Sequence, residues 1–234
     1  MDASLYGFLA ALVVTALLAF PLARPLRTHP SIFYAVALAL TALYVWALWT
    51  GVNLTPVRAL TVVLQKGYLA SLLLGVVMFT GCLDESSSLR RHLQPIRGEL
   101  SILSFVFILG HLLTYLPGYL GRFGALLTAR TSVALSLIVA MVLTVLFGVL
   151  TITSLRWLHK RMGTRSWKNL QRFSYLMVAL FALHIGLALG RSAFAGSPSG
   201  ATAVFALYLA VVALYAVLRV RKAVRNRNKR QVSA

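Results

Sequence analysis

The chain has 234 residues, of which 59% are hydrophobic and only 12% are charged, and its mean hydropathy is +0.83. A soluble domain is about half apolar and about a quarter charged, so the composition excludes an ordinary soluble globular protein. The formal net charge is +19. Because the basic residues lie in short runs between long apolar stretches, they are typical of the cytoplasmic anchors of membrane helices, and no nucleic-acid partner is expected.

Seven apolar stretches of about 20 residues, the length that crosses the hydrocarbon core of a membrane, follow one another along the chain. They are residues 4–23, 31–50, 67–83, 98–117, 131–153, 169–190 and 201–218. The first is interpreted as a retained helix, since no basic segment precedes it as in a signal peptide. Residues 52–66 are amphipathic and are predicted to lie along the outer surface. The sequence therefore predicts an all-α integral membrane bundle of about seven transmembrane helices that contacts membrane lipid.

Basic residues gather in one set of alternate loops, and the other set has few of them. The basic set comprises 24–27, 90–97, 156–172 and 219–230. Lysine and arginine concentrate on the cytoplasmic side of membrane proteins, so the N-terminus is expected outside and the C-terminus in the cytoplasm. The run from Arg219 to Arg230 is predicted to be a basic tail that anchors on anionic lipid. A multi-pass protein of a bacterial inner (cytoplasmic) membrane is expected.

Two of the five histidines, His111 and His184, fall inside apolar helices, where a titratable side chain points to function. His111 follows Arg97 by 14 residues and His184 follows Arg172 by 12, which is about 21 Å and 18 Å of helix. Both are therefore expected in the outer half of the bilayer. Two neutral imidazoles at one level on parallel helices can ligate a haem iron from its two faces, an arrangement that suits electron transfer.

Small and basic residues accompany the two histidines. Gly110 and Gly186 flank them and are predicted to let a macrocycle approach the backbone. Arg122 and Arg191 follow the two helices and are predicted to bind haem propionates. The alternative from the residues alone is that each histidine hydrogen-bonds a neighbouring helix and each arginine marks the membrane interface.

Two stretches, LRRHLQPIRGELSILSFVFILGHLLTYL and SWKNLQRFSYLMVALFALHIGL, resemble the ferric-reductase-like transmembrane domain family. Within it they are most similar to single-domain haem-binding membrane subunits, such as that of the periplasmic methionine sulfoxide reductase system. The resemblance covers roughly residues 67–190. It implies a haem-binding four-helix core over 67–190, preceded in 1–66 by two transmembrane helices and the amphipathic segment. The last helix and the basic tail occupy 191–234.

The family commonly binds a second haem through histidines 13 or 14 residues before the first pair. Those positions hold Arg97 and Gly98 on one helix and Leu170 and Gln171 on the other. The resemblance therefore implies one haem b in the outer leaflet and a lost inner site. Glu99 and Arg172, which match in depth at the inner end, are predicted either to pair there or to snorkel to the interface.

The function expected from these observations is that of a membrane b-type cytochrome. A quinol or a redox partner protein is expected to supply electrons, and an acceptor outside is expected to take them. The sequence has no flavin or nicotinamide domain, so an electron-transfer subunit of an oxidoreductase system is expected and no catalytic residue is assigned. The alternative is a haem-free transporter or scaffold subunit that retains the family fold.

Overall fold

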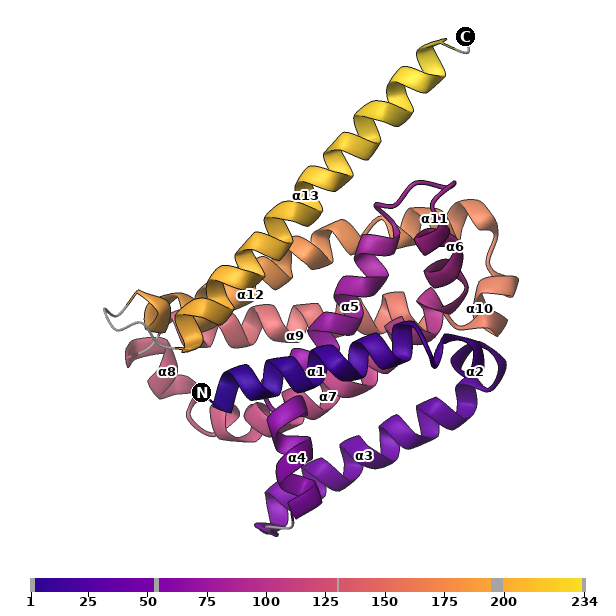
Figure 1. The fold of residues 1–234 in the computed structure, drawn as a ribbon. Coiled ribbons are helices and arrows are strands. Elements are labelled where there is room, and N and C mark those ends of the chain that lie inside the picture. The colour runs from indigo at the N-terminus through magenta and orange to yellow at the C-terminus, as the bar shows by residue number, and fades with distance from the viewer. Residues whose placement is uncertain (1–2, 53–54, 130, 195–199, 233–234) are drawn as a thin grey trace.

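The computed structural model describes residues 3–52, 55–129, 131–194 and 200–232. In these ranges every regular element is a helix, which confirms the all-α prediction (Figure 1). The first half of the chain forms α1 (Ala3–Ala19), α2 (Ala23–Thr28), α3 (Pro30–Thr50), α4 (Thr55–Leu64), α5 (Tyr68–Thr80), α6 (Ser88–Leu93) and the 3₁₀ turn η1 (Gln94–Ile96). The second half forms α7 (Arg97–Leu120), α8 (Phe123–Ala129), α9 (Thr131–Ile152), α10 (Arg156–Arg161), α11 (Thr164–Gln171), α12 (Ser174–Ala193) and α13 (Gly200–Val232).

Five helical spans in the described ranges are long and apolar enough to cross a membrane. They are Pro30–Thr50, Ser88–Leu120, Thr131–Ile152, Thr164–Gly190 and Thr202–Asn228. The helices α1 and α5 occupy the other two predicted stretches, and they are apolar but shorter, with 17 and 13 residues. A helix of 13 residues measures about 20 Å, which is less than the hydrocarbon core of about 30 Å. The count of seven spans and the orientation of the termini stay predictions.

One face of α9 shows that the bundle is built for an apolar surrounding. Large apolar side chains recur on it every three or four residues and are all exposed: Leu135, Ile138, Val142, Val145, Val149 and Ile152. Such spacing places them on one side of the helix. A stripe of this length facing water would be unfavourable, whereas lipid tails solvate it.

The helices α5, α7, α9 and α12 form the centre of the molecule, with α5 beside α7, α7 beside α9, and α9 beside α12. The N-terminal helices α1 and α3 pack on α5 and α7, and α13 runs along α12. Buried residues from α3, α5 and α7 meet in one hydrophobic cluster, among them Tyr44, Leu73 and Leu103. The N-terminal helices α1 and α3 and the central helices therefore share a core.

Helix ends follow local chemistry. Pro30 opens α3, where its missing N–H costs nothing, and Gly51 closes it in the left-handed conformation with φ 72°. The predicted first helix over 4–23 is interrupted, because α1 ends at Ala19 and α2 begins at Ala23 beyond Pro21. The predicted last helix over 201–218 is longer, because α13 continues to Val232.

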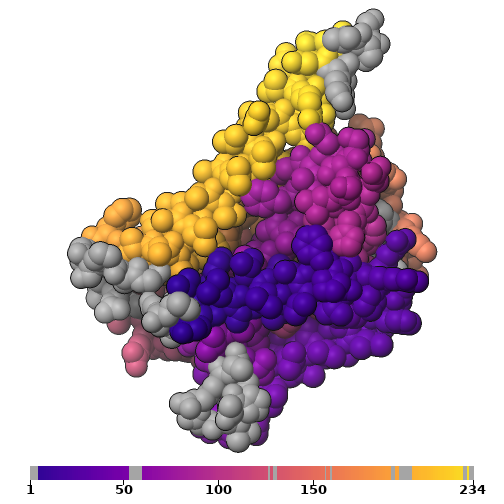
Figure 2. Space-filling view, viewed as in Figure 1, coloured from indigo at the N-terminus to yellow at the C-terminus, as the bar shows by residue number. Residues whose placement is uncertain are grey.

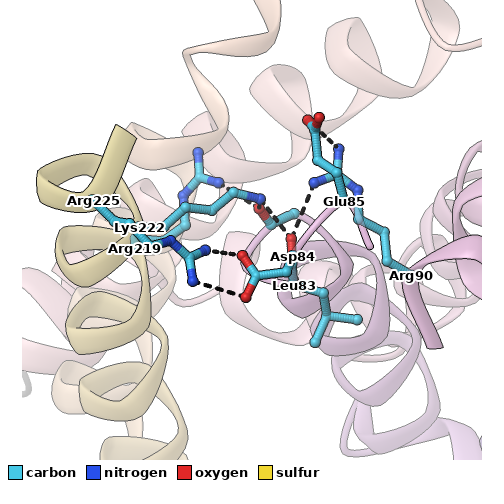
Figure 3. A network of polar contacts seen from close by, with 8 residues as sticks. Leu83, Asp84, Glu85, Arg90, Arg219, Lys222 and Arg225 are labelled. Atoms are coloured by element: carbon cyan, nitrogen blue, oxygen red, sulfur yellow. Dashed lines mark hydrogen bonds and ion pairs between the residues drawn. The ribbon is translucent and has the colours of Figure 1, made fainter. Parts of the chain in front are cut away.

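The C-terminal part of α13 extends past the central helices, and part of it contacts the loop between α5 and α6 (Figures 1 and 2). Lys222 Nζ donates to the carbonyl oxygen of Leu83 at 2.7 Å, and the guanidinium of Arg225 pairs with both carboxylate oxygens of Asp84. Figure 3 shows these cations converging on the loop. We call this set of contacts the tail clamp. The basic tail predicted as a lipid anchor is thus also held by protein.

Candidate functional site

His111 lies on α7 beside the junction of α4 and α5. Its Nδ1 is 2.7 Å from the backbone carbonyl oxygen of Gln65. Gly67, which precedes α5, has φ 68°, and a Cβ built there would lie 3.4 Å from His111 Cγ. Glycine is favoured at position 67 for two reasons, because both the left-handed backbone conformation and the close approach of the imidazole disfavour a side chain there.

His184 lies on α12 and is held by one residue of α9. Its Nδ1 is 3.0 Å from Ser136 Oγ and 3.1 Å from the carbonyl oxygen of Ser136. Ser136 is itself buried, with 4% of its surface exposed. The contact fixes the ring of His184 against the neighbouring helix.

These contacts determine which nitrogen of each neutral ring carries the proton. A carbonyl oxygen can only accept, so Nδ1 of His111 and Nδ1 of His184 both act as donors. In each ring Nε2 then keeps its lone pair, the state in which an imidazole ligates a metal. Histidine ligands typically hold their other nitrogen on a carbonyl in this way. The Nε2 atoms of His111 and His184 are therefore suitable axial ligands for a haem iron.

The two imidazoles belong to the same end of the central bundle. His111 is next to the start of α5, His184 is next to the first half of α9, and the two rings interact electrostatically. In the described part of the chain no three His, Cys, Asp or Glu side chains gather as a metal-binding group. A haem iron needs only two protein ligands, so the lack of a three-residue group does not argue against a two-histidine haem site.

The two glycines predicted to border a macrocycle have different surroundings. A Cβ at Gly110 would lie 3.0 Å from Thr41 Cγ2 and 3.7 Å from Tyr44 Cδ1. The bare backbone of Gly110 therefore serves the close packing of α7 on α3. A Cβ at Gly186 would meet no heavy atom within 4 Å, so this side of α12 has room for a bulky group.

The two arginines predicted to bind propionates are only partly described. Arg122 is exposed in the turn after α7, where its backbone N–H donates to Tyr119. Arg191 is in α12, but its side chain lies outside the described part. The propionate role of both stays a prediction.

Tyrosines beside His111 belong to its surroundings and were not singled out in the sequence. The ring centroid of Tyr115 is 5.1 Å from that of His111, and Tyr119 stacks on Tyr115 at 6.1 Å. The signal was available, because residues four apart on a helix share a face. Tyr44 adds a hydrogen bond of 2.8 Å to Thr114 Oγ1, which ties α3 to α7.

A cavity of about 210 Å³ lies at the other end of the bundle, between α5, α7, α9 and the α11–α12 segment. Its walls include Arg97, Gly98 and Gln171, three of the four positions at which the family pattern would place inner haem ligands. Ser101, also in its wall, precedes His111 by ten residues, or about 15 Å along the helix. The cavity is thus separate from the histidine pair.

Among the described side chains Glu99 and Arg172 form no ion pair with each other, although Glu99 has another polar partner. Glu99 is buried, with 5% of its surface exposed, which also contradicts snorkelling by this residue. Arg172 is exposed at the end of α11, as snorkelling requires.

His92, another histidine outside the central helices, bonds the carbonyl oxygen of Ala19 at 2.9 Å and stacks on Phe20. It holds the end of α1 in place.

No family model matches the chain, and no solved structure matches it. The chain is similar to a protein of Treponema pallidum (strain Nichols) whose description reads "Uncharacterized protein". The two are 29% identical over 222 residues, which is 94% of this chain and 61% of the relative. The chain thus spans about three fifths of the length of that relative.

Proposed function

We propose that the chain is a membrane b-type cytochrome in which His111 and His184 are the axial ligands of one haem in the outer half of the bilayer. The proposal includes seven membrane spans, an outer N-terminus and a bacterial inner membrane. It rests on two histidines in apolar helices whose Nδ1 atoms both bond carbonyl oxygens. In both rings Nε2 therefore keeps the lone pair that could ligate a metal.

When bound, the haem would supply a one-electron carrier between the ferric and ferrous states. The residues of the chain supply position and environment. Gln65 and Ser136 hold the two rings in orientation, and the open side of Gly186 leaves space for a planar group. A quinol or a redox partner protein would donate the electron, and an acceptor outside the membrane would receive it.

Absorption spectroscopy tests this function directly. The protein purified in mild detergent should show a reduced-minus-oxidised spectrum of b type, and a pyridine haemochrome assay should give one haem per chain. His111→Ala or His184→Ala should abolish the spectrum, because a single imidazole cannot supply both axial ligands. His29→Ala is the matched control, since His29 is exposed before α3 and should keep the full haem content.

A well-folded wild type without haem, prepared with ample haem during expression, would contradict the proposal. Retention of haem in both histidine variants would contradict the ligand assignment. Two haems per chain would show that the inner site is also a haem site, by ligands other than the family pair.

A haem-free scaffold is the second candidate, and one observation favours it. The hydrogen bond of His111 connects α7 to the α4–α5 junction, and that of His184 connects α12 to α9. Both side chains therefore have a structural role even without a cofactor. In this case His184→Ala would lower the melting temperature of a colourless protein. Under the cytochrome proposal the same substitution removes the haem absorption.

A further inference from the structure

The cavity at the inner end of the bundle contains a cation that has no ionic or hydrogen-bond partner among the described residues. Arg97 begins α7 and is partly buried in the cavity wall. In the described part of the chain its guanidinium makes no hydrogen bond and no ion pair. A guanidinium has five N–H donors and is always charged, so enclosing one without an acceptor is unfavourable.

The surroundings of Arg97 add positive charge. Arg219 of the last helix and Arg90 of α6 both interact with it electrostatically. Their own donors are directed elsewhere, Arg219 to the carbonyl oxygen of Gly81 and Arg90 to that of Leu83. Three clustered cations therefore make the mouth of the cavity attractive to an anion.

The cavity wall offers further hydrogen-bond donors. Gln171 reaches Leu150, Thr153 and Ser154 only at 3.4 to 3.5 Å, so its amide is loosely held. Ser101 also lines the space, from the same helix as Arg97. A guanidinium, an amide and a hydroxyl from two walls suit an oxyanion that accepts from several directions.

Much of the remaining lining is apolar. It is formed by side chains such as Met78, Phe147 and Met177. The cavity opens at the end of the bundle that carries the α5–α6 loop and the tail clamp, where the head groups of a surrounding membrane would lie. An ionic rim on an apolar interior suits the polar group of an amphiphile better than a fully solvated ion.

We propose that this cavity is a binding site for a phosphate group, with Arg97 as its principal ligand and Gln171 and Ser101 as additional donors. The phosphate belongs to an anionic phospholipid or to free inorganic phosphate. The site is independent of the proposed haem site, since it lies at the other end of the central helices.

Two arms of one experiment test the site and separate the two sources. In the first, protein in nanodiscs of phosphatidylcholine is titrated with inorganic phosphate, at constant ionic strength, while the melting temperature is followed. In the second, protein from nanodiscs containing phosphatidylglycerol is transferred to detergent, and the retained lipid is counted by native mass spectrometry. The wild type is compared with Arg97→Gln, Arg97→Lys and Arg91→Gln. Arg91 is an exposed arginine outside the cavity and serves as the matched control.

Retention of one phosphatidylglycerol by the wild type and by Arg91→Gln identifies a lipid head group as the source. A phosphate-dependent rise in melting temperature in phosphatidylcholine identifies the free ion. In either arm Arg97→Gln should weaken binding about tenfold or more, because one charge-assisted hydrogen-bond donor group is lost. Arg97→Lys keeps the charge but loses the fork, so its binding should lie between those of the wild type and Arg97→Gln.

The proposal is overturned if neither arm shows binding to the wild type, or if Arg97→Gln binds as the wild type does. It is also overturned if Arg97→Gln removes a second haem, which would assign the cavity to that cofactor. Haem content is measured on the same samples. A normal haem spectrum with lost phosphate binding in Arg97→Gln separates this site from the function proposed for His111 and His184.

Discussion

The two histidines of the candidate site are held with different numbers of acceptors. Nδ1 of His111 bonds the carbonyl oxygen of Gln65 alone, at 2.7 Å. Nδ1 of His184 has two neighbours on Ser136, the hydroxyl at 3.0 Å and the carbonyl oxygen at 3.1 Å. The hydroxyl can be removed by mutation and the carbonyl oxygen cannot, so substitution of Ser136 changes the environment of one proposed ligand without removing its imidazole.

If the chain binds haem as proposed, Ser136→Ala should retain the haem but bind it more weakly. The carbonyl oxygen still orients His184, whereas loss of the hydroxyl makes the imidazole a weaker electron donor. We expect haem affinity to fall about tenfold, as for other outer-shell partners, and the reduction potential to rise. Potentiometric titration and haem transfer to an acceptor protein measure the two effects. Ser104→Ala, which removes a buried bond to Ala70 on α5, should leave the potential unchanged; equal potentials in all three proteins would refute the role of Ser136.

Cys82 is the single cysteine of the chain, and its side chain is partly buried beside the loop that Arg219 and Lys222 contact. Burial limits the access of a reagent, so iodoacetamide should alkylate Cys82 more slowly than it alkylates free cysteine. Mass spectrometry follows the reaction, and equal rates for the two thiols would contradict the expectation.

The two histidines of the candidate site can be singled out in the sequence, whereas their hydrogen-bond partners cannot. His111 and His184 are conspicuous because a titratable residue in an apolar helix is rare. Gln65 and Ser136 are 46 and 48 residues away from them along the chain. Such contacts depend on the packing of whole helices, which periodicity does not encode. Gly110 was assigned to the cofactor by proximity in sequence, yet its helical face is turned to α3.

At the level of helices, α1 and α4 approach each other more closely than side chains normally allow. Gly7 is the contact point, and a Cβ built on it would overlap the carbonyl oxygen of Val62. Backbone atoms cannot rotate away as a flexible side chain can. The position of the amphipathic helix against the first helix therefore depends on this glycine.

Gly7→Ala should destabilise the protein by about 1–3 kcal/mol, because α4 must shift to admit the methyl group. Gly75→Ala in α5 is the matched control, since a Cβ there meets nothing within 4 Å. Its effect should be neutral or stabilising by up to about 1 kcal/mol through helix propensity. Thermal unfolding in one detergent compares the two. Similar losses for both variants would show that the close approach at Gly7 does not limit stability.

Most helix ends were predictable where a local signal exists. The predicted stretch 31–50 matches Pro30–Thr50, and 131–153 matches Thr131–Ile152. The apolar stretch 201–218 does not indicate where α13 ends, because a change from apolar to charged residues need not coincide with the end of a helix. Arginine and lysine favour helix nearly as well as alanine, so the helix continues through them to Val232.

At the level of the whole molecule, the tail clamp connects the last helix to the middle of the chain. The carboxylate of Asp84 pairs with Arg225, and both side chains are about half exposed to solvent. Screening by water therefore limits the pair to about 1 kcal/mol or less. Lys222 contributes separately, through backbone carbonyl oxygens that any sequence in the loop would offer.

Asp84→Arg should loosen the C-terminal part of α13, and trypsin should cut the tail up to about fivefold faster at low salt. The combined Asp84→Arg and Arg225→Asp variant should restore protection, since the pair is re-formed with its charges exchanged. Glu85→Arg is the comparison and should accelerate cleavage less, because Glu85 forms its ion pair with Arg90 of α6 and has only a longer-range electrostatic interaction with Lys222 of the tail. A difference that persists unchanged at high salt would contradict an ionic origin.

The tail clamp joins two segments that are synthesised at different times during translation. Asp84 and Arg225 are 141 residues apart. At ordinary rates of translation Arg225 is therefore synthesised on the order of ten seconds after the loop that contains Asp84. During that interval α5, the short apolar helix that ends just before the loop, has no contact with the tail. The final helix α13 then binds the α5–α6 loop, which was synthesised much earlier. The contact between α13 and this loop can therefore form only after the last helix has been synthesised.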